Sequence, residues 1–577
     1  MKKQLLFPLF AVIALTGCTF GTKSSSSSSY TTNSQISVDD PDEIDVVETD
    51  DEFAMSSKDG QFSSSGSIYT ISDAGTYSLS GKLSGQILVS AGDNDEVILE
   101  LNGASISYDQ DSPIKITNAS KVEISAKKDT DNIIRDNRGA KTSEISSQGE
   151  GAISADVDLK LKGYGTLVVA GGYNNGVYTS KDLTIQNLTL KSTGYNNAIK
   201  GKDSITISSG SIQAYASNGN GLRTDDSDTS SKGNQRGTIT VEGGSVYVDS
   251  LRDAFDASYN VVIDETSSDV STSVSIKTGK NSSYYTSSFK ADSEKGLKAA
   301  NEIIINKGTV VIASSDDAIH SNYGTSLENG SKGLGNITIN DGLVEVASGD
   351  DGLHADNTLT INGGKVVVTG ATEGYEGNYI NINGGYSYIY GTDDGVNCSK
   401  KTFSSCAFKM SGGYLDVAVK SGDTDGIDSN GSFTLSGGTI VTRGSPGTSG
   451  SGMSTGLDVD GTISMTGGTL VAFNGLEKSP SASSTIKYAG TSNANSSMGG
   501  GMGGPGMNKS VSSSISFAAG SYVLSGDGLD ISFVNDYVYG SFQIYSSSLV
   551  SNKTYTLYKD GSSHISWSQT SNSVTIS

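Results

Sequence analysis

The feature that most constrains the fold is a short motif that recurs along the chain. In each copy a polar or acidic pair precedes a small residue, an aliphatic residue, a polar residue and a second small residue. Clear copies are D-D-A-I-H-S at 316–321 and D-D-G-L-H-A at 350–355. The small residues after the pair, such as Ala152, Gly176 and Ala198, lie 22 to 24 residues apart. A period of this length indicates a chain built from stacked repeats.

The segments between the copies are rich in strand-forming residues and contain glycine bends. Short runs such as I-T-I at 337–339 and V-V-V at 366–368 favour β-strands, and the apolar residues lack helical spacing. Gly-Gly pairs, which tolerate positive φ, occur at 243–244, 363–364, 384–385, 412–413, 437–438 and 467–468. Leucine-rich repeats and WD propellers do not match this spacing. We therefore predict an all-β fold, a right-handed parallel β-helix (solenoid), over residues 61–490.

Stacked coils predict two columns of side chains. The aliphatic position of each copy should point inward, because only stacked coils can bury it. The inward column includes Ile319, Leu353, Val396, Ile427 and Leu457. The next residue should point outward and form a column of its own, about 4.8 Å per layer. The outward column is Lys200, Arg223, Asp256, Lys298, His320, His354, Asn397, Asp428 and Asp458.

The N-terminus resembles a bacterial export signal. A pair of lysines precedes a short apolar run, and L-T-G-C at 15–18 fits a lipobox, so residues 1–18 are predicted to be a lipoprotein signal peptide. Cys18 is then the lipidated residue, and the Ser-rich, acidic residues 19–60 are a disordered tether. The predicted location is the cell envelope, where a membrane-anchored lipoprotein is exposed outside the cytoplasm. An ordinary secretory peptide with an incidental Cys18 is the alternative.

The C-terminal part departs from the repeat. Residues 491–510 form a Gly/Met-rich flexible loop, and residues 511–577 contain strand-like runs at 521–525, 529–533 and 554–558 that suggest a closing β segment or cap. Two further cysteines, Cys398 and Cys406, are eight residues apart. In an oxidising envelope we expect them to form a disulfide that closes a local loop.

The charge of the chain excludes some partners. The formal net charge is −23, from 63 acidic and 40 basic residues. Such a surface repels phosphate, so nucleic acid is not an expected partner. It also repels an anionic polymer unless metal ions bridge the two. Membrane contact is expected only through the lipid anchor, and we expect a monomer.

Stacking would bring the repeated carboxylates together along one edge. Like charges a few ångströms apart raise pKa values or require a counter-ion, and Ca²⁺ accepts many oxygen ligands in flexible geometry. The predicted calcium ligands are Asp316, Asp317, Asp350, Asp351, Asp393, Asp394, Asp423, Asp425 and Asp428. In earlier copies asparagines, such as Asn174 and Asn175, replace them and indicate a structural amide ladder. The alternative is that aspartate is present only because bends favour it.

The combination of these motifs is similar to a known family. The alternation of D-D-G-[LIV]-x-[AS] with T-I-x-G-G-x-[VIL] resembles carbohydrate-binding β-helical surface proteins that bind calcium and polygalacturonate. The runs at 75–89 and 97–106 and the Gly/Met stretch carry the same resemblance, which covers residues 61–560. It implies a fold shaped like pectate lyases, calcium at Asp-rich turns and affinity for acidic plant polysaccharide. Several copies lack the Asp pair, and Glu294-Lys295 replaces it in one.

Three functions follow as hypotheses. The first is a non-catalytic binder of acidic polysaccharide, in which calcium bridges protein and uronate carboxylates. The second is a calcium-dependent polysaccharide (pectate) lyase, which needs a base to remove a sugar proton, with Lys298, Lys200 and Arg223 as candidates. The third is a structural adhesin. The predicted ligand-binding residues are His320, His354, Lys200, Arg223 and Lys298.

Overall fold

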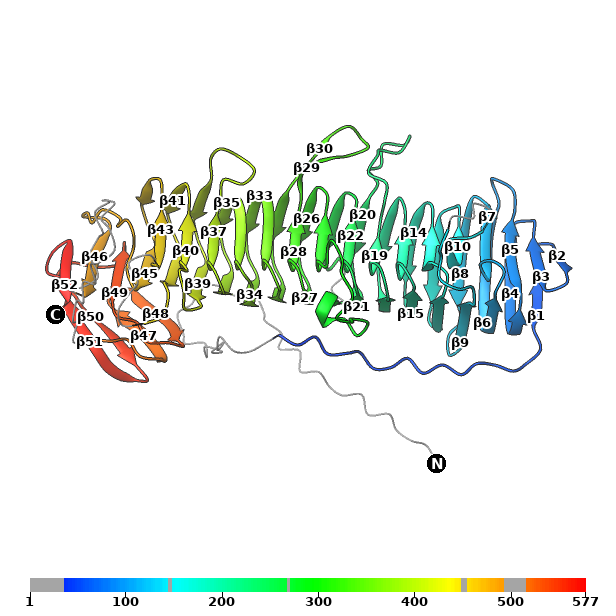
Figure 1. Ribbon diagram of the computed structural model, residues 1–577, viewed down its shortest axis with the longest axis horizontal. Helices are drawn as coiled ribbons and strands as arrows, with labels where there is room; N and C mark the ends of the chain where they lie inside the picture. Colours follow the sequence, from blue (N-terminus) through cyan, green and yellow to red (C-terminus); the bar gives the residue numbers. More distant parts are fainter. Residues whose placement is uncertain (1–35, 144–147, 267–269, 448–453, 492–514, 577) are drawn as a thin grey trace, which may run out of the picture.

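The chain folds almost entirely into β-strands. The computed structural model describes residues 36–143, 148–266, 270–447, 454–491 and 515–576. Within these ranges one short 3-10 helix, η1 (Gly279–Asn281), is present, and no helix is long and apolar enough to cross a bilayer. Strands stack side by side along the long axis of the molecule (Figure 1). The predicted lipidation site Cys18 and residues 492–510 of the predicted Gly/Met-rich loop lie outside the described residues.

Three columns of parallel strands make up the stack, because most strands pair with the strand three places later in the chain. The first column carries the repeated motif. Its strands are β3 (Ile68–Ile71), β5 (Gln86–Ser90), β7 (Ile114–Asn118), β10 (Gly151–Ala155), β13 (Asn175–Thr179), β16 (Ile199–Gly201), β19 (Leu222–Arg223), β22 (Phe255–Ala257), β25 (Leu297–Ala299), β28 (Ile319–Ser321), β33 (Leu353–Ile361), β35 (Tyr375–Ile382), β37 (Val396–Cys398), β40 (Ile427–Ser429) and β43 (Leu457–Val459).

The second column follows the motif in each coil. It consists of β4 (Gly75–Ser84), β6 (Glu96–Tyr108), β8 (Lys121–Ala126), β11 (Leu159–Gly163), β14 (Asp182–Gln186), β17 (Ser204–Ile207), β20 (Thr238–Val241), β23 (Asn260–Ile263), β26 (Glu302–Ile305), β31 (Asn336–Ile339), the second halves of β33 and β35, β38 (Ala407–Met410), β41 (Ser432–Leu435) and β44 (Ile463–Met465).

The third column completes each coil after the glycine bend. It consists of the second halves of β4 and β6, β9 (Asp131–Asp136), β12 (Thr166–Gly171), β15 (Leu188–Gly194), β18 (Gly210–Ala216), β21 (Gly244–Ser250), β24 (Thr272–Thr278), β27 (Thr309–Ala313), β32 (Leu343–Ala347), β34 (Lys365–Gly370), β36 (Tyr386–Gly391), β39 (Tyr414–Val419), β42 (Thr439–Arg443) and β45 (Thr469–Phe473).

The core lies inside the stack and runs along it as one continuous cluster. The predicted inward residues pair with one another from coil to coil: Ile319 with Leu353, and Ile427 with Val396 and Leu457. All are fully buried. The inward prediction is therefore confirmed, and the large, mostly parallel sheet confirms the all-β class. The handedness of the coil stays a prediction.

Glycine makes the bend between the second and third columns in the coils that carry a Gly-Gly pair. The second glycine of each predicted pair has a positive φ, for example +71° at Gly364 and +75° at Gly385. A Cβ built on Gly385 would lie 2.7 Å from main-chain atoms of the preceding coil. Both the left-handed conformation and the close approach of the coils therefore require glycine here.

The two ends of the stack carry antiparallel strands. At the N-terminal end β1 (Ala54–Ser57) pairs with β4, and β2 (Phe62–Ser65) pairs with β3. At the C-terminal end β49 (Phe542–Ser546) pairs with β45 and with β46 (Lys487–Thr491), which also pairs with β52 (Ser573–Ile576). The predicted C-terminal strands are present within a separate antiparallel sheet. That sheet consists of β47 (Gly520–Gly526), β48 (Leu529–Asn535), β50 (Thr554–Lys559) and β51 (Ser562–Ser568).

The segment before β1 runs along the side of the stack (Figure 1). Val38 is buried in a small cluster with Tyr247 and Ala313. The Asp40 carboxylate accepts hydrogen bonds from the Tyr247 hydroxyl and from Nζ of Lys277, each at 2.6 Å. In the structure, residues 36–60 of the predicted disordered tether lie against the coils through these contacts and through the pairing of β1.

The predicted disulfide is also wrong. Cys398 and Cys406 are both free and buried. Cys398 points into the core from β37, and the Cys406 thiol donates to the main-chain carbonyl of Cys398 at 3.1 Å. Spacing in sequence suggested a closed loop, but the second thiol is directed at the main chain of the first residue. Burial raises the pKa of the Cys398 thiol to about 12 and raises the pKa of Cys406.

These free thiols give a direct test of the correction. In a Cys18→Ser chain, Ellman's reagent should detect no thiol under native conditions, because both groups are buried and protonated. Denaturant should expose two equivalents without any reductant. If the two thiol equivalents appear only after reduction, Cys398 and Cys406 form a disulfide after all.

Candidate functional site

The outward side chains of the first column form one continuous row. The strand register joins Lys200 to Arg223, Arg223 to Asp256, Asp256 to Lys298, and Lys298 to His320. The row continues from His320 through His354, Glu376, Asn397 and Asp428 to Asp458. The structure thus brings together the predicted ligand-binding residues, with one coil more than the motif indicates.

The coil that was missed carries E-G-Y-E-G at 373–377. Tyr375 takes the inward position, and Glu376 takes the outward position. The motif did not predict this coil, because an aromatic residue replaces the usual aliphatic one and the acidic pair is absent. The spacing could have revealed this coil, because Gly374 follows Gly352 by 22 residues, which is the period of the repeat.

The second residue of each polar pair has a structural role that asparagine and aspartate share. Its side-chain oxygen accepts the main-chain N–H of the corresponding residue in the next coil. Asp317 accepts from Asp351 at 3.0 Å, and Asn197 accepts from Asn220 at 3.3 Å. The same contact joins Asp394 to Asp425 at 2.8 Å. The second aspartate of each predicted calcium pair therefore belongs to a hydrogen-bond ladder between coils. The copies with asparagine and the copies with aspartate differ at this position only in charge.

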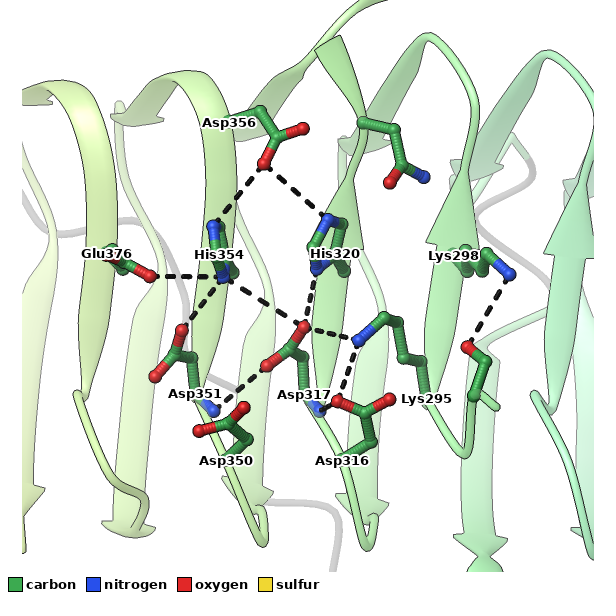
Figure 2. A network of polar contacts seen from close by, with 12 residues as sticks. Lys295, Lys298, Asp316, Asp317, His320, Asp350, Asp351, His354, Asp356 and Glu376 are labelled. Atoms are coloured by element: carbon green, nitrogen blue, oxygen red, sulfur yellow. Dashed lines mark hydrogen bonds and ion pairs between the residues drawn. The ribbon is translucent and has the colours of Figure 1, made fainter. Parts of the chain in front are cut away.

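The first acidic pair, Asp316 and Asp317, obtains counter-ions from the protein itself (Figure 2). Nζ of Lys295 lies 2.7 Å from an oxygen of Asp316 and 2.6 Å from Oδ2 of Asp317. Nδ1 of His320 lies 2.5 Å from that same Oδ2. Burial alone would raise the pKa of Asp317, but His320 and Lys295 outweigh it and hold that pKa well below its usual range. Aspartate crowding here does not by itself require a metal ion.

The next coil repeats this arrangement with a second histidine. Nδ1 of His354 lies 2.8 Å from Oδ2 of Asp351 and 3.2 Å from Oε2 of Glu376, and Nε2 lies 3.4 Å from Asp356. Burial would lower the pKa of His354, but the surrounding carboxylates raise it to about 10. Burial and the neighbouring acids raise the pKa of Asp351, although His354 opposes this.

The later acidic residues lack such partners. In the described part of the chain, no lysine, arginine or histidine forms an ion pair with the remaining predicted ligands, which are Asp350, Asp393, Asp394, Asp423, Asp425 and Asp428. Burial, followed by the charges of neighbouring aspartates, raises the pKa of Asp394 to about 7 and that of Asp428 to about 6. The pKa values of Asp393 and Asp425 are also raised, mainly by burial. This cluster, Asp393–Asp428, is the uncompensated acidic group of the site.

A surface pocket of about 300 Å³ lies over the row of outward side chains. Arg223, Asp256 and Lys298 line it from the coils, and Asn322 and Thr325 line it from the inserted loop that carries the hairpin of β29 (Tyr323–Ser326) and β30 (Lys332–Leu334). Basic, acidic, amide and hydroxyl groups therefore converge on one space. Motif analysis did not predict the inserted residues, because their position depends on how a loop folds back onto the coils.

The basic residues of this region are paired with aspartates. Lys200 lies 2.6 Å from Asp225, and Nε of Arg223 lies 2.8 Å from the same carboxylate. Nζ of Lys298 lies 2.9 Å from Asp253. Burial would lower the pKa of Lys298, but the nearby aspartates outweigh it and raise that pKa. Lys298 is therefore a cation at neutral pH and does not have the neutral amine that a general base needs.

The uncompensated acidic group makes stability depend on pH. The pKa of Asp394 is about 7 in the folded chain, against an ordinary value of 3.8, so the folded state retains a proton that the unfolded state releases. Without divalent cations, the melting temperature should fall as pH rises from about 4 through about 7. Asp394→Asn keeps the acceptor for Asp425 and removes the charge. It should raise the melting temperature at pH 8 by about 2 °C and change it little at pH 5.

Asp341→Asn, on the exposed bend between β31 and β32, is the matched control and should change neither value. Equal melting temperatures for Asp394→Asn and the unmodified chain at pH 8 would contradict this account of the acidic group.

Part of the chain is similar to known proteins. Residues 65–351 match the family of carbohydrate-binding domain-containing proteins. A carbohydrate-binding domain-containing protein of Acetivibrio thermocellus is 31% identical over 199 residues, which cover 33% of this chain and 65% of that protein. The match thus spans less than two thirds of that relative's length.

One solved structure also matches, with 30% identity and a TM-score of 0.36. It is described as the polysaccharide lyase-like protein from C. thermocellum in a gadolinium derivative, and the match covers 41% of this chain and 90% of that one. The residues matched by the family, 65–351, include the pocket and the first acidic pairs.

Proposed function

We propose that this protein is a non-catalytic, calcium-dependent binder of acidic polysaccharide such as polygalacturonate. It would act in the cell envelope as a monomer held to the membrane by lipid on Cys18. The observation that carries the binding proposal is the pocket over Arg223, Asp256 and Lys298 in the row of outward side chains. The similarity of residues 65–351 to carbohydrate-binding domain-containing proteins supports it independently.

The arrangement of the coils suits an extended polymer. We take the fold to be a right-handed parallel β-helix, in which equivalent side chains recur about every 4.8 Å along the axis. The row from Lys200 to Lys298 therefore offers polar groups at regular steps on one face. A linear polysaccharide that lies along the axis would contact several of them at once, so weak contacts at single sugars add up.

The chemistry of the pocket fits a uronate. The guanidinium of Arg223 has five N–H donors, and its side chain is 41% exposed, so a sugar carboxylate can approach it beside Asp225 and Asp256. Lys298 adds positive charge, while Asp256, Asn322 and Thr325 supply groups that bond to sugar hydroxyls. Both parts of an acidic sugar, its carboxylate and its hydroxyls, therefore have partners here.

Calcium fits the uncompensated acidic group better than the first acidic pairs. Asp394, Asp425 and Asp428 are carboxylates whose described neighbours include no cation, and hard oxygen ligands suit Ca²⁺. At Asp316 and Asp317, Lys295 already supplies the positive charge. Bound calcium would neutralise the repulsion between these aspartates and the repulsion between the acidic surface and a uronate polymer.

A pull-down with insoluble pectin tests the binding proposal. The full chain should be retained in millimolar calcium and released by EDTA. Arg223→Gln and Lys298→Gln should each weaken retention about tenfold, because each removes a charge-assisted contact to uronate. Lys307→Gln is the matched control, since Lys307 is also paired with an acid, Glu265 at 2.6 Å, but lies outside the pocket. Circular dichroism checks that each variant is folded.

Three outcomes would redirect the proposal. Retention that survives EDTA would remove calcium from the mechanism, and no retention at all would leave the structural adhesin. Unsaturated sugar product, detected by ultraviolet absorbance with polygalacturonate and calcium, would show a lyase and would contradict the non-catalytic part.

A further inference from the structure

Two of the three histidines form a stacked pair on adjacent coils. The rings of His320 on β28 and His354 on β33 have centroids 4.5 Å apart and an interplanar angle of 33°. Because the strands are in register, both rings present Nδ1 toward the acidic pairs at the bend and Nε2 toward Asp356 (Figure 2). The pair is half-buried in the middle of the row, next to the pocket residue Lys298.

Carboxylates surround the Nδ1 edge at distances suited to a metal ion. Oδ2 of Asp317 lies 2.5 Å from Nδ1 of His320 and 4.0 Å from Nδ1 of His354. Asp351 and Glu376 approach Nδ1 of His354 at 2.8 and 3.2 Å. Two overlapping triads share His354: Asp317–His320–His354 and Asp351–His354–Glu376. Within each triad the ligand atoms lie within 4.8 Å of one another. Zinc bonds of about 2.1 Å place tetrahedral ligand atoms about 3.4 Å apart, which is within this range.

The opposite edge of the rings has the partner that metal-binding histidines usually have. Oδ1 of Asp356 lies 3.7 Å from Nε2 of His320 and 3.4 Å from Nε2 of His354. A carboxylate at the remote ring nitrogen orients the imidazole and fixes its tautomer, so that the other nitrogen faces the metal. Asp356 is within hydrogen-bond reach of His354 and lies close to the same edge of His320.

Glu376 supplies an independent observation. Its side chain is 1% exposed, and Oε1 is paired with Lys401. Its Oε2 is buried and forms no well-aligned hydrogen bond, although His354 and Asp351 lie beside it. Leaving a buried carboxylate oxygen without a hydrogen bond is costly. This oxygen points at Nδ1 of His354, where it lies 3.2 Å away (Figure 2). A cation between the two would satisfy it.

We propose that His320 and His354, together with Asp317, Asp351 and Glu376, bind one divalent transition-metal ion of the zinc class. Imidazole nitrogens select such an ion over calcium, which takes oxygen ligands. Lys295 does not prevent this, because it contacts Asp316 at 2.7 Å and keeps that partner when Asp317 binds the ion. This site is separate from the uncompensated acidic group and does not depend on carbohydrate binding.

Competition with a chromophoric chelator tests the site in the full chain. After removal of metals with EDTA and dialysis, Zn²⁺ is titrated in the presence of excess Ca²⁺. We expect one high-affinity Zn²⁺ per chain. His354→Gln and Glu376→Gln should each weaken that affinity at least about tenfold, because each removes a ligand. His564→Gln, the third histidine, on β51 of the C-terminal sheet, is the matched control and should leave the affinity unchanged.

A second readout separates coordination from a structural role of the ion pairs. Co²⁺ should give visible d–d absorption in the unmodified chain and in His564→Gln, and this absorption should be lost in His354→Gln while circular dichroism stays unchanged. The proposal is overturned if the unmodified chain binds no Zn²⁺, if calcium displaces it, or if His354→Gln binds it as tightly. Each result would leave histidines that only pair with carboxylates.

Discussion

The main-chain hydrogen bonds between successive coils set the position of every functional side chain. Parallel pairing in register places Leu353 on Ile319 inside the stack and His354 on His320 outside it. A slip of one residue would move the apolar side chains to the outside and the polar side chains to the inside. Burial of the apolar core therefore also determines which side chains form the outward row. The ladder of side-chain acceptors at the bend, such as Asp317 to the N–H of Asp351, adds a second constraint on the same register.

The same acidic motif has two electrostatic environments, and the residue three places after the second acid distinguishes them. Where that residue is histidine, as in Asp317–His320 and Asp351–His354, each buried carboxylate has a basic side chain beside it. Where it is Asn397 or Asp428, the carboxylates of Asp394 and Asp425 have only main-chain and hydroxyl donors. Desolvation then raises their pKa values, because no described cation opposes it. Two neighbouring stretches of one row therefore suit different ions.

Much of the architecture could be predicted from sequence spacing, and the exceptions have physical causes. The repeat predicted the strands, the inward residues and the glycine bends, since each depends on a local preference that recurs. It missed the coil at Tyr375, because the inward position accepts any large apolar side chain and not only an aliphatic one. The eight-residue spacing of Cys398 and Cys406 also predicted a disulfide. The direction of a thiol depends on the strand or loop that carries it, however, and not on the distance along the chain.

The sequence by itself determined the coil, since a repeated pattern of apolar and bend residues can bury its core only by stacking. It also determined which side chains share a row. Only the tertiary structure decided their electrostatic partners. Lys295 reaches Asp317 and Glu376 reaches His354 from neighbouring coils, and Asn322 and Thr325 reach the pocket from an inserted loop. Such contacts depend on distances of a few ångströms across coils, whereas periodicity along the chain specifies only the order in which the coils stack.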